Sequence, residues 1–105
     1  MLALNSFQPL TRAFVVSCPH GIHLRVAARI VTLTTSFQSA IWFSSRTRSA
    51  NAKSILGLLE LGLAEGDSVT MTARGPDAEP ALTAIRVLLE DRVTVCVEPV
   101  LRSAR

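Results

Sequence analysis

The apolar residues of this chain change their spacing repeatedly, and this feature restricts its fold more than any other. In residues 68–74, Val69, Met71 and Ala73 alternate with polar residues, as in a strand that buries one face. In residues 24–37, apolar residues recur at helical spacing instead. Both patterns in a chain of 105 residues predict one small domain in which helices cover a sheet.

The other segments are bounded by turn and capping residues. Short β-branched or aromatic runs indicate strands, and Ser54 and Gly62 are suited to begin and end a short helix. The expected order is strand, helix, strand, strand, short helix, strand and helix, at residues 12–18, 24–37, 39–44, 46–50, 54–61, 68–74 and 77–92. This order predicts a two-layer α+β domain with its helices on one sheet face.

The two ends of the chain carry less pattern. We expect residues 1–10 to be an N-terminal leader, residues 11–92 to form the domain, and residues 93–105 to be a C-terminal extension. Val93 to Val97 alternate again, so this part of the extension either adds a strand or trails from the last helix.

Composition narrows the classes of function. The net charge is +3, and the basic residues do not cluster over a helix length, which argues against nucleic-acid binding and favours an acidic protein partner. No apolar run is long enough for a membrane span. Cys18 and Cys96 are the only cysteines and lack metal-site spacing, so we expect reduced thiols in a cytoplasmic protein.

The residues with the clearest chemical potential lie where the first strand leads into the first long helix. Gly21 lets the chain bend, His23 offers an imidazole that titrates near neutrality, and Arg25 offers a permanently charged fork of donors. The first amides of a helix have no partner within the helix and attract anions. These residues therefore predict a phosphate site. We interpret His20, three residues before His23, as structural, with a position close to His23 and a role at the site as the alternative.

Two segments resemble one known family. Residues 21–28, Gly-Ile-His-Leu-Arg-Val-Ala-Ala, are similar to the HPr active-site signature of Gly, Leu or Ile, His, any residue, Arg, Pro and Ala. Residues 53–62 resemble the family's regulatory-serine segment at the expected distance from the histidine. The resemblance implies a four-stranded antiparallel sheet with three helices on one face. It also implies a phosphocarrier protein of the bacterial phosphotransferase system, which is a transfer intermediate and not an enzyme.

The same resemblance implies a role for each matching residue. His23 would accept a phosphoryl group on Nδ1 from Enzyme I and pass it to an Enzyme IIA-type acceptor, with no cofactor and no metal. Arg25 would neutralise the phosphoryl oxygens, and the amides of Leu24 and Arg25 would donate hydrogen bonds to them. An apolar surface would dock the partners, formed by Leu24, Ile55, Leu56 and Leu59.

Two residues need separate comment. Val26 stands where the family has Pro. This difference removes the preset φ of proline and restores an amide donor, and its effect on the rate of phosphoryl transfer is left open. Ser54 is suited to capping a helix, and the resemblance also implies regulatory phosphorylation there, with HPr kinase/phosphorylase as a partner. We expect a monomer that binds neither nucleic acid nor membrane.

Two other functions stay open at this point. The first is a regulatory relative that acts through phospho-Ser54, although the presence of His23 and Arg25 argues against a purely serine-based regulator. The second is a small α+β binding module in which His23 has no role in transfer. This module would show no phosphotransfer at all.

Overall fold

Seven regular elements follow one another in the predicted order. The computed structural model describes residues 8–90. Its elements are β1 (Leu10–Val15), α1 (Leu24–Thr34), β2 (Ala40–Ser44), β3 (Ser49–Asn51), α2 (Ile55–Leu61), β4 (Ser68–Arg74) and α3 (Ala78–Glu90). The leader and the extension lie mostly outside the described residues, as does the alternating segment 93–97, so the division of the chain into three parts stays a prediction.

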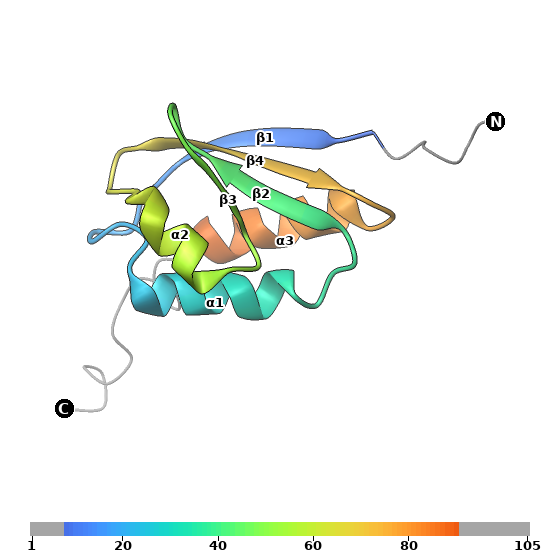
Figure 1. The fold of residues 1–105 in the computed structure, drawn as a ribbon, viewed down its shortest axis with the longest axis horizontal. Helices are drawn as coiled ribbons and strands as arrows, with labels where there is room; N and C mark the ends of the chain where they lie inside the picture. Colours follow the sequence, from blue (N-terminus) through green and yellow to red (C-terminus); the bar gives the residue numbers. More distant parts are fainter. Residues whose placement is uncertain (1–7, 91–105) are drawn as a thin grey trace.

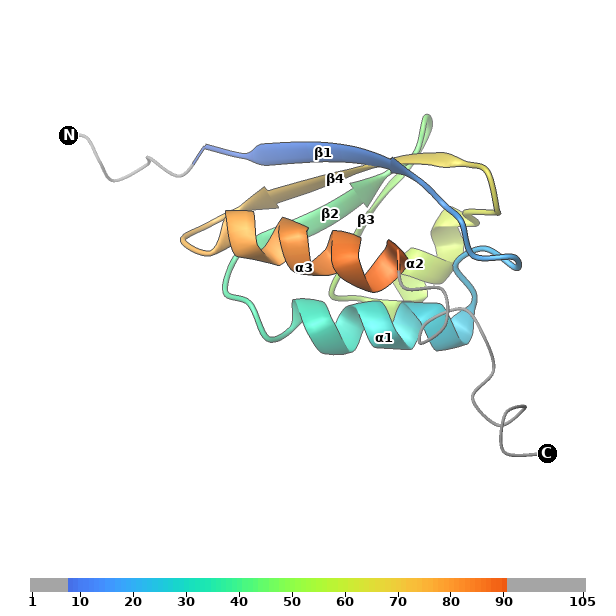
Figure 2. The same ribbon diagram turned by 180° about the vertical axis from the view of Figure 1, so that it is seen from behind.

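The four strands form one antiparallel sheet in the order β1-β4-β2-β3. The register pairs Phe14 with Val69 and Phe43 with Met71, so the side chains that point inward lie side by side across the sheet. All three helices lie on the same side of the sheet (Figures 1 and 2). The predicted α+β fold, with a four-stranded antiparallel sheet and three helices on one face, is therefore confirmed.

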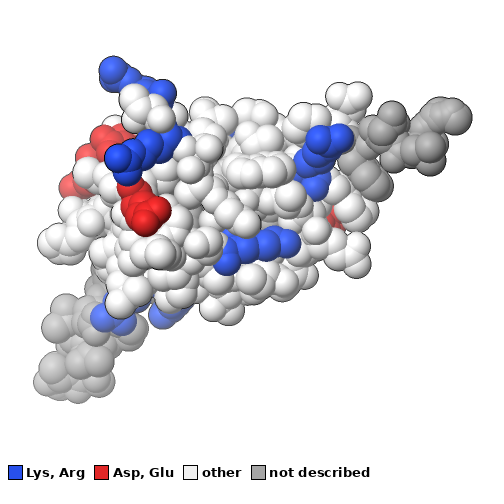
Figure 3. All heavy atoms as spheres, viewed as in Figure 1, with Lys and Arg blue, Asp and Glu red and all other residues white. Residues whose placement is uncertain are grey.

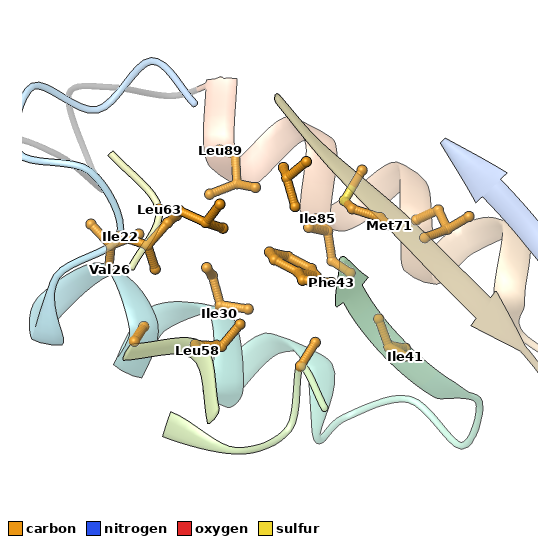
Figure 4. Packing of buried hydrophobic residues seen from close by; sticks show 14 of the residues in the cluster. Ile22, Val26, Ile30, Ile41, Phe43, Leu58, Leu63, Met71, Ile85 and Leu89 are labelled. Atoms are coloured by element: carbon orange, nitrogen blue, oxygen red, sulfur yellow. The ribbon is translucent and has the colours of Figure 1, made fainter. Parts of the chain in front are cut away.

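The hydrophobic core fills the space between the sheet and the helices. Phe43 of β2 lies at its centre, facing Ile30 of α1 and Ile85 of α3, and Leu58 of α2 closes one side (Figure 4). The rings of Phe14 and Phe43 meet edge to face with their centroids 6.0 Å apart. The core thus fixes the position of α1, and the site described below lies at the start of this helix.

Several bounds differ from the prediction: β1 already begins at Leu10, for example, and local hydrogen bonds explain three of the other differences. β1 ends at Val15 because Val16 exchanges backbone hydrogen bonds with the loop at Gly66 and Asp67. α1 ends at Thr34 instead of residue 37, and the next two residues turn their hydroxyls back onto helix carbonyls. β3 starts at Ser49 because residues 45–48 form the turn that joins it to β2.

Asp77 joins two loops at the end of the domain away from the start of α1. Its carboxylate accepts hydrogen bonds from the amides of Gln38 and Ser39 and from the Ser39 hydroxyl. The Ser39 hydroxyl and the Gln38 amide lower the pKa of Asp77 below its usual value of 3.8. The lowered pKa means that the ionised carboxylate stabilises the connection between α1 and β2.

Cys18 corrects an expectation about the thiols. It is buried, with 2% of its surface exposed, and it is disulfide-bonded. The prediction of a reduced thiol is therefore wrong for this residue, because two cysteines without a motif spacing leave their oxidation state undetermined. Cys96 lies outside the described residues. Among residues 8–90, no helix has the length and apolar character to cross a membrane.

Candidate functional site

His23 caps the N-terminus of α1. Its backbone is extended, with φ −92° and ψ −175°, and its carbonyl accepts the amide of Ala27 at 2.8 Å. The His23 Nδ1 accepts the amide of Arg25 at 3.3 Å. A nitrogen that accepts a hydrogen bond carries a lone pair and no proton, so the neutral ring carries its proton on Nε2. The Nδ1 lone pair is thus directed toward the start of the helix.

Two contacts with the backbone near Leu63 hold the loop that carries His23. Ile22 is buried and its amide donates to the carbonyl of Leu63 at 3.0 Å. Gly21 has φ +69°, and a Cβ at this position would come within 2.2 Å of the same carbonyl oxygen. Only glycine fits both the backbone conformation and the space there. The predicted bend at Gly21 is therefore confirmed, together with a close approach that the sequence did not reveal.

The start of α1 favours an anion. The amides of Leu24, Arg25 and Val26 belong to the first helical turn, where amides have no partner within the helix. No acidic residue lies in this turn of the fully described helix α1. The helix end contributes about 0.3–1 kcal/mol toward a bound anion, and a hydrogen bond from a charged guanidinium about 1.5–3 kcal/mol. A helix start of this kind can bind an anion such as a phosphate.

Val26 explains how the first turn is fixed without the family's proline. Its side chain is fully buried in the core between α1 and the neighbouring elements (Figure 4). Burying a valine contributes about 1.5–3 kcal/mol relative to leaving it exposed. Packing therefore fixes the turn here, where a proline would fix it through its ring.

Ser54 caps α2 as predicted, with its hydroxyl accepting the amide of Gly57 at 3.0 Å. α2 packs against α1, which places the two sequence segments on one side of the molecule (Figure 1). Three of the four predicted docking residues are exposed, and the fourth is half-buried against the core. Leu24 is 61% exposed, Ile55 36% and Leu56 65%, whereas Leu59 is the half-buried one.

Basic side chains form small separate groups on the face drawn in Figure 3, with acidic side chains among those at one end. This distribution agrees with the interpretation of dispersed charge and gives no continuous basic surface on that face. Arg48, for example, is exposed and donates to the backbone carbonyl of Glu60 at 3.0 Å.

His20 lies beside His23, which is the alternative that the sequence left open for this residue. The rings of His20 and His23 lie with their centroids 6.4 Å apart and their planes at 60°. A spacing of three residues places two side chains together only when the backbone turns between them. The signal available in the sequence was the pair Pro19 and Gly21, which favours such a turn.

The comparisons with known proteins agree with this geometry. The family model described as the PTS HPr component phosphorylation site matches residues 10–91. The phosphocarrier protein HPr of Lysinibacillus sphaericus is 40% identical over 81 residues, which cover 77% of this chain and 92% of that protein. The solved structure of HPr-C-His from Thermoanaerobacter tengcongensis has a TM-score of 0.76 at 34% identity, covering 79% of this chain and 93% of that one.

A larger relative carries the same unit as a small part of its chain. A multiphosphoryl transfer protein of Xanthomonas campestris pv. campestris is 35% identical over 77 residues, which are 73% of this chain but 9% of that protein. The family model, the matched relatives and the shared fold lead to one conclusion. The chain belongs to the HPr family of phosphocarrier proteins of the phosphotransferase system.

Proposed function

We propose that His23 accepts a phosphoryl group on Nδ1 from a phosphohistidine of Enzyme I and donates it to an Enzyme IIA-type protein. In the first step the Nδ1 lone pair attacks phosphorus and forms a new N–P bond, while the N–P bond of the donor breaks with its electron pair returning to the donor imidazole. His23 releases its Nε2 proton to solvent, and the donor nitrogen takes up a proton in exchange. The second step repeats this chemistry with His23 as the donor. The observation that carries the proposal is the hydrogen bond that the His23 Nδ1 accepts from the Arg25 amide at the start of α1.

Arg25 and the first amides of α1 stabilise the transferred group in this proposal. When Nδ1 is phosphorylated, the Arg25 amide loses its imidazole acceptor and a phosphoryl oxygen can take that place. The guanidinium neutralises part of the phosphoryl charge. Arg25→Gln should therefore slow transfer by about tenfold or more, since a charged hydrogen bond contributes about 1.5–3 kcal/mol. The melting curve should barely change, and an unchanged transfer rate would remove Arg25 from the site.

Partner docking uses the exposed apolar residues beside the site. Leu24 adjoins His23 in sequence, and Ile55 and Leu56 begin the helix that packs against α1. Grouped apolar side chains of this kind mark protein interaction surfaces. Leu56→Ser should weaken binding to Enzyme I while leaving the fold intact, because the side chain is mostly exposed.

The test of the phosphoryl acceptor uses a variant that keeps the helix cap. Asn caps helices as well as any residue, so His23→Asn should fold like the wild type while losing the nucleophile. Incubation with phosphoenolpyruvate and Enzyme I from the same organism should add one acid-labile phosphate to the wild type and none to His23→Asn. His20→Ala retains His23 and should still be labelled at a high ratio of phosphoenolpyruvate to pyruvate, which shows that the label depends on His23. Labelling of His23→Asn would refute the assignment.

Ser54 is our proposed regulatory site, with HPr kinase/phosphorylase as the modifying enzyme. Its hydroxyl caps α2 directly before the exposed Ile55 and Leu56. A phosphate there adds about −1.5 to −2 charge, which suits a helix start but must be desolvated when a partner docks. Binding to Enzyme I should therefore weaken without a loss of fold.

Two capping residues separate the effect of charge at position 54 from the effect on the helix. Ser54→Asp and Ser54→Asn both retain a good cap, and only the first adds a negative charge. Titration calorimetry should show weaker binding to Enzyme I for Ser54→Asp alone, with unchanged circular dichroism for both. Equal affinities would mean that Ser54 serves only as a cap.

A cytoplasmic location is part of this proposal and is supported by the family's link to the phosphotransferase system. The disulfide at Cys18 weighs against it, because cytoplasmic thiols are normally kept reduced. The oxidation state of Cys18 in cells can be measured by quenching the cells with acid, alkylating the free thiols and analysing the protein by mass spectrometry. Alkylated Cys18 in freshly quenched cells supports the cytoplasmic assignment, and an unmodified Cys18 contradicts it.

A further inference from the structure

Two consecutive turns bring His20 beside His23. The Gly21 amide donates to the Cys18 carbonyl at 2.9 Å and closes a turn that has His20 at its third position. The His23 amide then donates to the Gly21 carbonyl at 3.1 Å and closes a second, tighter turn. The resulting distance between the two ring centroids is 6.4 Å. Their proximity is thus fixed by backbone hydrogen bonds.

The turn that carries His20 is itself anchored. Cys18 at its start is buried and disulfide-bonded, and Gly21 at its end packs against the carbonyl of Leu63. His20 between them is exposed, so its ring can rotate while its backbone stays in place. With its backbone fixed and its side chain exposed, His20 can reorient its ring when His23 carries a new group.

We propose that His20 is a positioning residue that donates a hydrogen bond to an oxygen of the phosphoryl group carried by His23. This inference rests on the proposed function, because it needs phospho-His23. The amides of α1 approach the phosphoryl group from the helix, and His20 approaches it from the preceding loop. A phosphoryl group has three terminal oxygens, so donors from two directions can be satisfied together.

The charge of the imidazole makes this contact depend on pH. Imidazole gains a proton as the pH falls through neutrality, and a hydrogen bond from a cation to an anionic oxygen is about twice as strong as a neutral one. Within residues 8–90, the charged groups on α1, on the connection before β4 and at the end of α3 are Arg25, Arg29, Glu65, Asp67 and Glu90. His23 carries an imidazole as well, so a comparison with His20→Ala is needed to separate the pH response of the loop histidine from that of the ring that carries the phosphoryl group.

The experiment measures how far His23 is phosphorylated at equilibrium. The full chain is incubated with a catalytic amount of Enzyme I at fixed ratios of phosphoenolpyruvate to pyruvate, at about pH 6 and about pH 8.5. His20→Ala removes the donor, and His20→Asn retains an uncharged donor. At the lower pH we expect the equilibrium constant for phosphorylation to fall about tenfold in His20→Ala, and the loss to shrink at the higher pH.

The equilibrium constant for phosphorylation of His20→Asn should lie between those of the wild type and His20→Ala. Its difference from the value for His20→Ala should change little between the two pH values. The ³¹P resonance of phospho-His23 should move with pH in each protein, because the imidazole that carries the phosphorus can itself take up a proton, and the movement should be smaller in His20→Ala than in the wild type. Labelled His23 with the same equilibrium constant in all three proteins would overturn this inference alone. An equal loss at both pH values, with altered circular dichroism, would overturn it as well and show a distorted turn. A wild type that takes no phosphate on His23 would refute the proposed function itself.

Discussion

Replacing Gly21 with Ala should destabilise the protein much more than the same replacement of Gly62. Both glycines have a left-handed backbone, with φ +69° and +63°. The Cβ of an alanine at Gly21 would lie 2.2 Å from the Leu63 carbonyl oxygen and 2.8 Å from the Ala64 Cα, whereas at Gly62 nothing lies within 4 Å. The pair therefore separates the cost of the backbone conformation from the cost of the close approach.

The magnitudes follow from these two costs. A left-handed conformation costs a residue with a Cβ about 1–2 kcal/mol. Forcing an extra carbon into a packed site costs about 1–3 kcal/mol more. The free energy of unfolding should thus fall by about 1–2 kcal/mol in Gly62→Ala and by about 2–5 kcal/mol in Gly21→Ala. The Gly21 variant cannot relax cheaply, because the colliding atoms are backbone atoms and the Leu63 carbonyl also accepts the Ile22 amide.

Urea denaturation followed by circular dichroism measures both free energies of unfolding. For a domain of this size each kcal/mol also corresponds to about 4–8 °C in melting temperature, so the two variants should be separated in a thermal scan. Gly21→Ala should in addition impair phosphorylation below its melting temperature, since the displaced loop carries His23. Equal losses for the two variants would refute the argument, because they would mean that the approach to Leu63 carries no cost.

Three further predictions concern other parts of the molecule. Thr34→Val should lower the free energy of unfolding by about 1–3 kcal/mol, since the buried Thr34 hydroxyl donates to the Ala52 carbonyl at 2.8 Å; the exposed Thr32→Val is the control, and equal losses in urea denaturation would contradict the reasoning. The lowered pKa of Asp77 means that its stabilising effect is present above the unfolded value near 3.8 and disappears as the pH falls through the folded value. The free energy of unfolding should therefore fall less with decreasing pH in Asp77→Asn than in the wild type, and identical profiles of this free energy against pH would contradict the role of Asp77. Alkylation in denaturant without a reductant should leave Cys18 unmodified by intact mass, and modification of Cys18 under these conditions would show that it is a free thiol.

The sequence predicted the elements best where side-chain pattern and turn residues agree. Residues 68–74 form β4 with the predicted bounds, because strict alternation ends at glycine turns on both sides. α2 likewise starts after Ser54 and ends before Gly62, since both caps are local interactions. β3 was misplaced because its limits depend on the turn at residues 45–48, where the hydroxyl of Ser45 accepts the Arg48 amide.

The candidate site was largely predictable because its parts lie close together in the chain. Residues 18–25 carry the turn, the histidine cap and the first amides of α1. Apart from the bond between the Ile22 amide and the Leu63 carbonyl, the hydrogen bonds that build the turn and the cap span two to four residues. Such bonds depend on residue type and spacing, both of which the sequence displays. A phosphate site at a helix start can therefore be inferred without knowledge of the tertiary structure.

What the sequence could not supply is the support of that site from distant segments. The carbonyl of Leu63 both receives the Ile22 amide and leaves no room for a side chain at Gly21, although it lies about forty residues further along the chain. A glycine that is needed for its backbone conformation and a glycine that is needed for lack of space look the same in a sequence. They differ only in what surrounds them in the fold, which is why Gly21 and Gly62 should respond differently to the same substitution.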